Sequence, residues 1–246
     1  MALWLVGSAG CKLMTSSDSD DKPSDQVISG TRNVLVEMFT NIHCPVCAGV
    51  HASIDQYSST SPNASRVNTV YYHLPYPYPN EPLFLANTAE NSARNEYYGG
   101  ASSTPRVYLD GSAQSGFSAS AVDTRIGIPT TLEISLSGTA DTSQFTVQAS
   151  IQRSGGLSPT DLVIHFIAVE TVDTTGNNGV SPQHNVMRKM ITGTGGEPFS
   201  IGDGETATVS KSVTVDSTWI PANLRVIVFV QSAGSKEVVQ SASIAY

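Results

Sequence analysis

The sequence predicts two folded regions, an α/β region at residues 31–126 and an all-β sandwich at residues 127–246. Strand patterns alternate with helical patterns up to about residue 124, and helical patterns disappear after Pro129. A length of 246 residues allows two cores of ordinary size. The composition, with 14% charged residues and abundant serine, threonine and glycine, also favours β-structure and an extracytoplasmic setting.

Residues 1–11 resemble a bacterial lipoprotein signal segment. An apolar run at residues 2–6 is followed by small residues and then by Cys11. Ala9 and Gly10 fit the positions before a lipidated cysteine, although Ser8 stands where leucine is commoner and no basic residue precedes the run. Cys11 is therefore the predicted lipidation site. The alternative is a frayed apolar tail with a free thiol.

Residues 12–30 are polar, acidic and aperiodic, which is typical of a flexible linker. No later run reaches the ~18 apolar residues of a membrane span, so we expect a lipid anchor without a crossing. The predicted location is the bacterial cell envelope, at the outer membrane, facing the periplasm or the outside. A net charge of -8 without basic clusters argues against nucleic acid as a partner.

The α/β region contains three apolar strand patterns and two helical patterns. The first helix is expected to bury Val46, Val50, Ile54 and Tyr57, which recur about one turn apart. A turn at Asp110-Gly111 closes the last strand. The predicted order is strand 34–40, helix 45–58, strand 67–74, helix 84–98 and strand 106–109.

The second region contains seven short strand patterns separated by turn clusters. This spacing predicts an antiparallel sandwich of the immunoglobulin-like kind. Partial alternation at 144–152 supports a strand with one buried face. The predicted strands are 131–136, 144–152, 161–169, 185–191, 207–215, 224–231 and 237–244.

Cys44 and Cys47 open the first predicted helix directly after a buried strand, with Pro45 at a first-turn position that needs no N–H. The positive end of the helix dipole would stabilise a thiolate at Cys44. Cys47 lies one turn further on, within reach of a disulfide. This placement predicts an exposed, attacking Cys44 and a more buried, resolving Cys47.

These residues resemble the thioredoxin superfamily. The resemblance rests on the strand VLVEMFT at 34–40, the motif Cys44-Pro-Val-Cys47 and the stretch STPRVYLDG at 103–111. It implies that Thr104-Pro105 takes the position of a cis-proline facing the cysteines. It further implies catalytic roles for Cys44, Cys47 and Pro105, with Pro105 positioning the substrate backbone and keeping metals off the sulfurs.

Two departures limit what the resemblance implies. Thioredoxins place a buried acid six residues before the first cysteine, whereas Glu37 lies seven before Cys44. Glu37 could assist proton transfer from Cys47 if the loop bulges, or it could be a strand-end charge facing solvent. The dipeptide Pro45-Val46 leaves the direction of redox chemistry open. His43 is a candidate for stabilising the Cys44 thiolate electrostatically. The alternative is that His43 is an ordinary loop residue with no role at the site.

The whole chain is similar to the outer-membrane protein 28-like family of bacterial lipoproteins. The similarity covers residues 30–246 and includes QHNVMRKM at 183–190 and LRVIVFVQ at 224–231. It implies an envelope location and says little about activity.

Two further patterns are candidate sites. His43 and His51 flank the cysteines as H-C-x-x-C-x-x-x-H, but helix-surface histidines are usually solvated, so no metal and no cofactor is predicted. Tyr76 and Tyr78 lie in a proline-rich loop that could grip an extended substrate peptide. The alternative is a loop that packs its own tyrosines.

The sequence thus predicts an envelope lipoprotein that exchanges thiols and disulfides with envelope proteins, with a Cys44–Cys47 disulfide as the resting state. The alternative is a non-catalytic surface or adhesion protein in which the disulfide is structural and the sandwich binds a partner. The sequence does not predict an oligomeric state.

Overall fold

The computed structural model describes residues 30–141 and 143–246. Cys11, the predicted signal segment and all of the predicted linker except Gly30 lie outside the described residues. Within the described part, no helix combines the length and apolar character that crossing a membrane requires.

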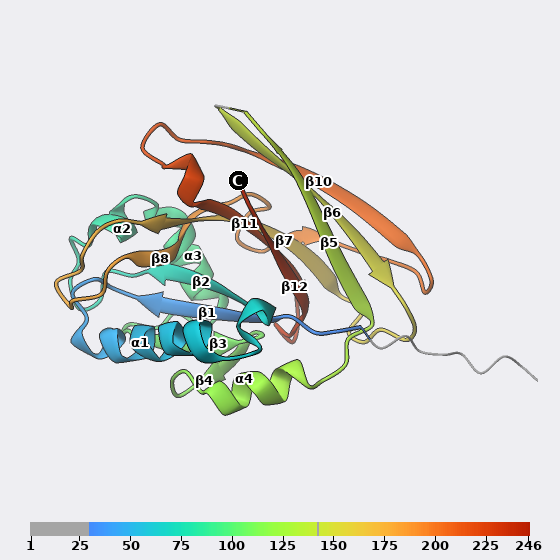
Figure 1. The fold of residues 1–246 in the computed structure, drawn as a ribbon, viewed down its shortest axis with the longest axis horizontal. Coiled ribbons are helices and arrows are strands. Elements are labelled where there is room, and N and C mark those ends of the chain that lie inside the picture. Colours follow the sequence, from blue (N-terminus) through green and yellow to red (C-terminus); the bar gives the residue numbers. More distant parts are fainter. Residues whose placement is uncertain (1–29, 142) are drawn as a thin grey trace, which may run out of the picture.

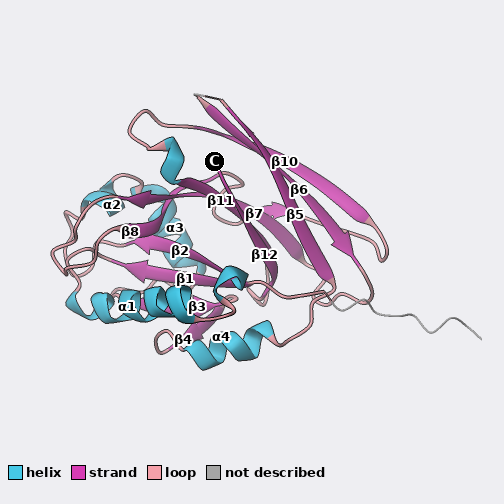
Figure 2. Cartoon of the chain, viewed as in Figure 1, coloured by secondary structure: helices cyan, strands magenta, loops and turns pink. Residues whose placement is uncertain are grey.

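The described chain is mostly β with few helices (Figure 1, Figure 2). The helices are α1 (Pro45–Thr60), α2 (Pro82–Leu85), α3 (Thr88–Tyr97) and α4 (Ala119–Ile126), with short 3-10 turns η1 (Ala64–Arg66) and η2 (Pro221–Asn223). The strands are β1 (Val34–Thr40), β2 (Val67–His73), β3 (Arg106–Leu109), β4 (Ser112–Gln114), β5 (Leu132–Ala140), β6 (Gln144–Arg153), β7 (Leu162–Val172), β8 (Gln183–Met190), β9 (Glu197–Pro198), β10 (Thr206–Thr214), β11 (Leu224–Ser232) and β12 (Val238–Ala245).

Strand β1 is central and buried along its whole length, as expected for an apolar strand covered on both faces. It pairs in parallel with β2 and antiparallel with β3. Helix α1 follows it as predicted, but its buried face differs from the prediction. Val46 is 69% exposed, and the buried residues are Cys47, His51, Ile54 and Tyr57.

The helix predicted at 84–98 is broken into α2 and α3. Asn87 leaves the helical conformation, and its side chain accepts a hydrogen bond from the Glu90 N–H, so it caps a new helix. Helix α4 was not predicted. It starts at Ser118, whose hydroxyl accepts from the Ala121 N–H.

All seven strands predicted after residue 129 are present, but they do not form a separate sandwich. Strands β5, β6 and β10 make a three-stranded sheet. The other four join the first region in a mixed sheet ordered β12-β11-β7-β8-β2-β1-β3-β4, with β9 beside β7. Strands β2 and β8 connect the two regions through the parallel pair Tyr71 and Val186.

The large sheet has a different cover on each face. One face carries a cluster shared by both regions, with Leu35 and Phe39 of β1 packed beside Ile167 of β7 and Phe229 of β11. The other face is covered by α1 and α4 at β1 and β3, and by the three-stranded sheet at β7, β11 and β12 (Figure 1). Residues 31–126 and 127–246 therefore share a continuous sheet and the apolar cluster on one of its faces, while each region also has an apolar cluster of its own.

Candidate functional site

Cys44 and Cys47 form a disulfide at the N-terminus of α1, with their Cα atoms 5.3 Å apart. Cys44 is the N-cap residue, and Pro45 occupies the first helical position. The Cys47 N–H donates to the Cys44 sulfur at 3.1 Å. A free N–H at a helix N-terminus is the kind of group that stabilises a thiolate when such a disulfide is reduced.

The two sulfurs are less accessible than the sequence predicted. Cys44 is 3% exposed and Cys47 is fully buried. Cys47 is the more buried of the two cysteines, as predicted, but Cys44 is not exposed, which the prediction had expected. The physical reason is that loops from three separate parts of the chain converge on residues 41–44.

The first of these loops contains Thr104 and Pro105, and the peptide bond between them is cis. The Thr104 carbonyl oxygen lies 3.7 Å from the Cys44 sulfur. Strand β3 begins one residue later and pairs with Phe39 of β1, which brings Pro105 to the end of β1 from which α1 departs.

The second loop carries Tyr76 and Tyr78. The Thr104 hydroxyl donates to the Tyr76 carbonyl at 2.8 Å, and the Asn41 side chain donates to the Tyr78 carbonyl at 3.0 Å. The His43 and Tyr78 rings lie 4.1 Å apart. Tyr76 and Tyr78 are 37% and 41% exposed, so they form an aromatic rim beside the disulfide.

The third loop comes from the second region and was missed by sequence reasoning. It is the β7–β8 loop, residues 173–182. The Asn178 N–H donates to the Ile42 carbonyl at 3.0 Å, and the Asn177 side chain lies 2.7 Å from Nδ1 of His43. Asn-Asn-Gly is an ordinary turn sequence. No local signal points from it to a loop more than 130 residues earlier in the chain.

The structure does not bring Glu37 to the cysteines. Side chains alternate across a strand, and Glu37 lies on the face of β1 opposite Val36 and Met38, which pack with the cysteines. Glu37 is fully buried and accepts two hydrogen bonds from Arg94, at 2.8 and 3.0 Å. It is therefore neither a partner of Cys47 nor a charge facing solvent.

His51 lies one helical turn after Cys47 and is 2% exposed, so it is not a solvated surface residue. Its Nε2 atom lies 3.0 Å from the Thr40 hydroxyl, and its ring stacks on Tyr71. Burial is the main cause that lowers the pKa of His51 to about 4, and His73 and His184 add to the shift. Among the described residues, no group of three or more His, Cys, Asp or Glu side chains is arranged to hold a metal ion.

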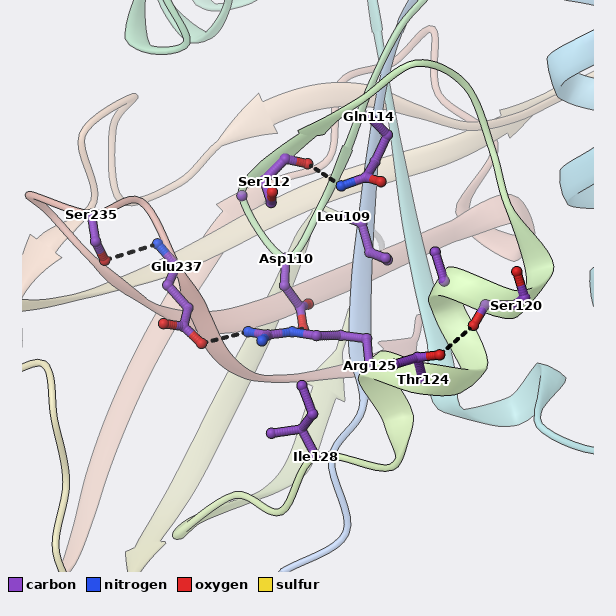
Figure 3. A pocket seen from close by; sticks show the side chains of 12 residues that line it. Leu109, Asp110, Ser112, Gln114, Ser120, Thr124, Arg125, Ile128, Ser235 and Glu237 are labelled. Atoms are coloured by element: carbon purple, nitrogen blue, oxygen red, sulfur yellow. Dashed lines mark hydrogen bonds and ion pairs between the residues drawn. The ribbon is translucent and has the colours of Figure 1, made fainter.

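A separate cleft of about 620 Å³ lies at the β3–β4 turn and α4 (Figure 3). Arg125 crosses it, donating to Asp110 at 2.7 Å and to Glu237 at 2.6 Å. The buried Arg32, which does not line the cleft, also contacts Asp110, so this carboxylate pairs with two cations. The Asp110 N–H donates to the Leu35 carbonyl, which places this cleft at the end of β1 away from the disulfide.

The chain is a mostly β protein built on a mixed sheet, and solved bacterial structures share this fold. HBP35 of Porphyromonas gingivalis superposes with a TM-score of 0.74 at 16% identity, over 88% of this chain and 76% of that chain. An Agrobacterium tumefaciens protein superposes with a TM-score of 0.58 at 17% identity, over 88% and 95%.

A domain of the outer membrane lipoprotein Omp28 from Porphyromonas gingivalis superposes with a TM-score of 0.36 at 15% identity, over 47% of this chain and 88% of that chain. No family model matches the sequence, and no curated protein sequence matches it. The likeness to HBP35 and to the Agrobacterium tumefaciens protein, at 16% and 17% identity, establishes the fold alone.

Proposed function

We propose that this chain exchanges thiols and disulfides with proteins of the bacterial cell envelope, through a thioredoxin-like site joined to an immunoglobulin-like β-region. The observation that carries the proposal is the disulfide at the N-terminus of α1 with the Thr104–Pro105 segment against its outer sulfur. The exposed tyrosines beside it offer a surface for a polypeptide substrate.

In the reduced protein, the Cys44 thiolate attacks one sulfur of a substrate disulfide and expels the other sulfur as a thiolate. A mixed disulfide now joins Cys44 to the substrate. The Cys47 thiolate then attacks the Cys44 sulfur, releases the second substrate thiol and closes the Cys44–Cys47 disulfide. The substrate is reduced by two electrons and the protein is oxidised by two. Starting from the disulfide, the same steps run in reverse and oxidise a substrate dithiol.

The envelope location rests on the sequence, with Cys11 as the proposed lipid anchor after Ala9 and Gly10. An oxidising compartment is also where a disulfide such as Cys44–Cys47 persists.

A second candidate function is a surface or adhesion protein with a structural disulfide, and the burial of both cysteines favours it. The two candidates differ in how readily the disulfide is reduced. Structural disulfides have potentials below about −300 mV, whereas catalytic ones are reduced more easily.

The decisive experiment is a trap with Cys47→Ala in the full chain, expressed in a bacterial envelope. Without the resolving thiol, Cys44 should retain its substrates as mixed disulfides, which a reductant releases. The Cys44→Ala/Cys47→Ala protein is the control. If Cys44 captures no protein and the potential of the pair lies below about −300 mV, the structural role is correct.

A further inference from the structure

The β7–β8 loop belongs to the second region of the chain, and it contacts residues 41–44, the segment that presents the outer cysteine. The base of the loop is fixed by apolar packing, since Val172 and Val186, which flank it, pack around Ile42. The tip follows the backbone of residues 41–44 closely. A Cβ atom on Gly176 would lie 2.9 Å from the Ile42 carbonyl oxygen, so glycine is needed for this approach.

Asn178 makes the central contacts of the β7–β8 loop. Its backbone N–H donates to the Ile42 carbonyl at 3.0 Å. Its side-chain Nδ2 donates to the carbonyl of Cys44 at 3.2 Å and to that of Asn41 at 3.4 Å. Its Oδ1 accepts from the Val180 N–H at 3.2 Å, which holds the side chain in this orientation. One amide group therefore fastens both ends of the turn that leads into α1.

The turn held by Asn178 sets the surroundings of the Cys44 sulfur. Cys44 is the N-cap of α1, and the sulfur faces the Cys47 N–H at 3.1 Å only while the turn keeps its shape. Hydrogen bonds and the helix dipole favour the charged form of a thiol that faces them. A looser turn would move the sulfur away from these donors and weaken that stabilisation.

We propose that Asn178 is a positioning residue for Cys44: it holds the N-terminal turn of α1 so that the Cys47 N–H stabilises the Cys44 thiolate. The inference rests on the proposed function, because it concerns the reactivity of the same disulfide. If Asn178 has this role, the second region contributes to the reactivity of Cys44, since the β7–β8 loop connects two strands that follow residue 127.

The substitutions are Asn178→Ala and Asn178→Asp in full-length protein. Asn178→Asp keeps an oxygen for the Val180 N–H and removes the donor to the two carbonyls. The matched control is Thr175→Ala in the same loop, where Thr175 is exposed and makes no side-chain hydrogen bond in the described structure. Thermal unfolding checks that each protein is folded.

The first measurement is the pH dependence of Cys44 alkylation in the Cys47→Ala background. Loss of the Asn178 amide should raise the midpoint by about half a pH unit to one unit. The second is the equilibrium of the Cys44–Cys47 disulfide with glutathione. Because the reduced form loses stabilisation, the equilibrium constant for reduction should fall about three- to tenfold, where tenfold is about 30 mV.

Thr175→Ala should change neither measurement. Repeating Asn178→Asp near 1 M salt, where charges are screened beyond about 3 Å, separates the lost donor from the added charge. If Asn178→Ala does not fold, Asn178→Asp at high salt carries the test. Midpoints and equilibrium constants within error of the parent in folded variants would show the inference to be wrong.

These measurements are independent of any substrate. A Cys47→Ala protein that captures envelope proteins while the Asn178 variants leave Cys44 unchanged would support the proposed function and reject the role of Asn178. Shifted midpoints would support the role of Asn178 even if no protein is captured and the potential of the pair lies below about −300 mV, the result that rejects the exchange function.

Discussion

At the scale of single residues, His51 is the clearest case of a side chain whose role depends on packing. It lies on the same face of α1 as Cys47 and is enclosed by Thr40 and Tyr71. The imidazolium would have to lose its hydration there, and burial accordingly lowers the pKa of His51 to about 4. His51 is therefore neutral in the folded protein at neutral pH.

His51 should make folding stability fall in acid. The unfolded chain binds a proton at this histidine below about pH 6.5, whereas the folded chain does so only near pH 4, so the free energy of unfolding falls as pH drops between these values. The full effect is about 3 kcal/mol. In His51→Phe, which keeps a stacked ring, urea unfolding should show a correspondingly weaker pH dependence in this window. His184→Gln, at the half-buried His184, is the control, and equal slopes for all three proteins would contradict the assignment.

Glu37 and Arg94 form a buried ion pair within the first region, and Arg94 links this pair to the second region. Both side chains are fully buried, and Arg94 also donates to Gln231 of β11 at 3.2 Å. Tyr98 donates to Glu37 and, like Arg94, lies next to Gln231. This cluster crosses from β1 to a strand of the second region, so it supports the shared core.

Glu37→Gln should destabilise the protein by about 3–5 kcal/mol, because it leaves the Arg94 charge buried without its partner. Denaturant unfolding measures this effect, and Glu133→Gln at an exposed position should change stability by less than about 0.5 kcal/mol. The glutathione equilibrium of the disulfide should not change in folded Glu37→Gln, since the residue lies on the other face of the sheet. A changed equilibrium of the disulfide with glutathione would indicate that Glu37 acts on the cysteines after all.

At the scale of elements, the loop with Tyr76 and Tyr78 is held by its backbone while its rings face solvent. The hydrogen bonds run from Thr104 and Asn41 to main-chain carbonyls. Exposed aromatic rings on a fixed backbone lose little conformational entropy when a partner binds, and such rings are typical anchors for a polypeptide.

Tyr76→Ala should reduce the yield of trapped mixed disulfides in the Cys47→Ala protein by about fivefold or more, as expected for the loss of one aromatic anchor. In a Tyr76→Ala protein that keeps both cysteines, the equilibrium of the disulfide with glutathione should not change, because a small thiol does not need to contact the aromatic rim. Ile220→Ala, which removes a side chain that is 50% exposed in the second region, is the control. Equal trapping by Tyr76→Ala and its parent would indicate that the loop packs only its own tyrosines.

The extents of most elements follow from local sequence. The predicted ranges of β1, α1, β2, β3 and the seven later strands agree with the structure to within a few residues. The break between α2 and α3 was not predicted, although Asn87 followed by Glu90 at the third helical position is a helix-start pattern, because the apolar spacing predicts one continuous helix. The spacing along α1 correctly placed Ile54 and Tyr57 on the buried face, but Val46 is exposed, because that face runs through Cys47.

At the scale of the whole molecule, the regions before and after residues 126–127 share the large sheet and one apolar cluster. We therefore expect the chain to unfold in one transition, with equal calorimetric and van't Hoff enthalpies. Residues 30–128 alone should not fold, because truncation exposes the apolar face that packs on β7 and β11. Two resolved transitions, or a folded N-terminal fragment, would contradict this expectation.

The sequence by itself determined the mostly β character, the strands and the place of the two cysteines at a helix start, because these depend on contacts between neighbours along the chain. It also paired the distant Thr104-Pro105 with the cysteines through a family motif. Only the tertiary structure decided which face of β1 carries Glu37, how deeply Cys44 lies, that His51 is buried and that Asn178 reaches the same turn. Those features depend on sheet order and on contacts between segments distant in the sequence, more than 100 residues apart in the case of Asn178, which no local pattern encodes.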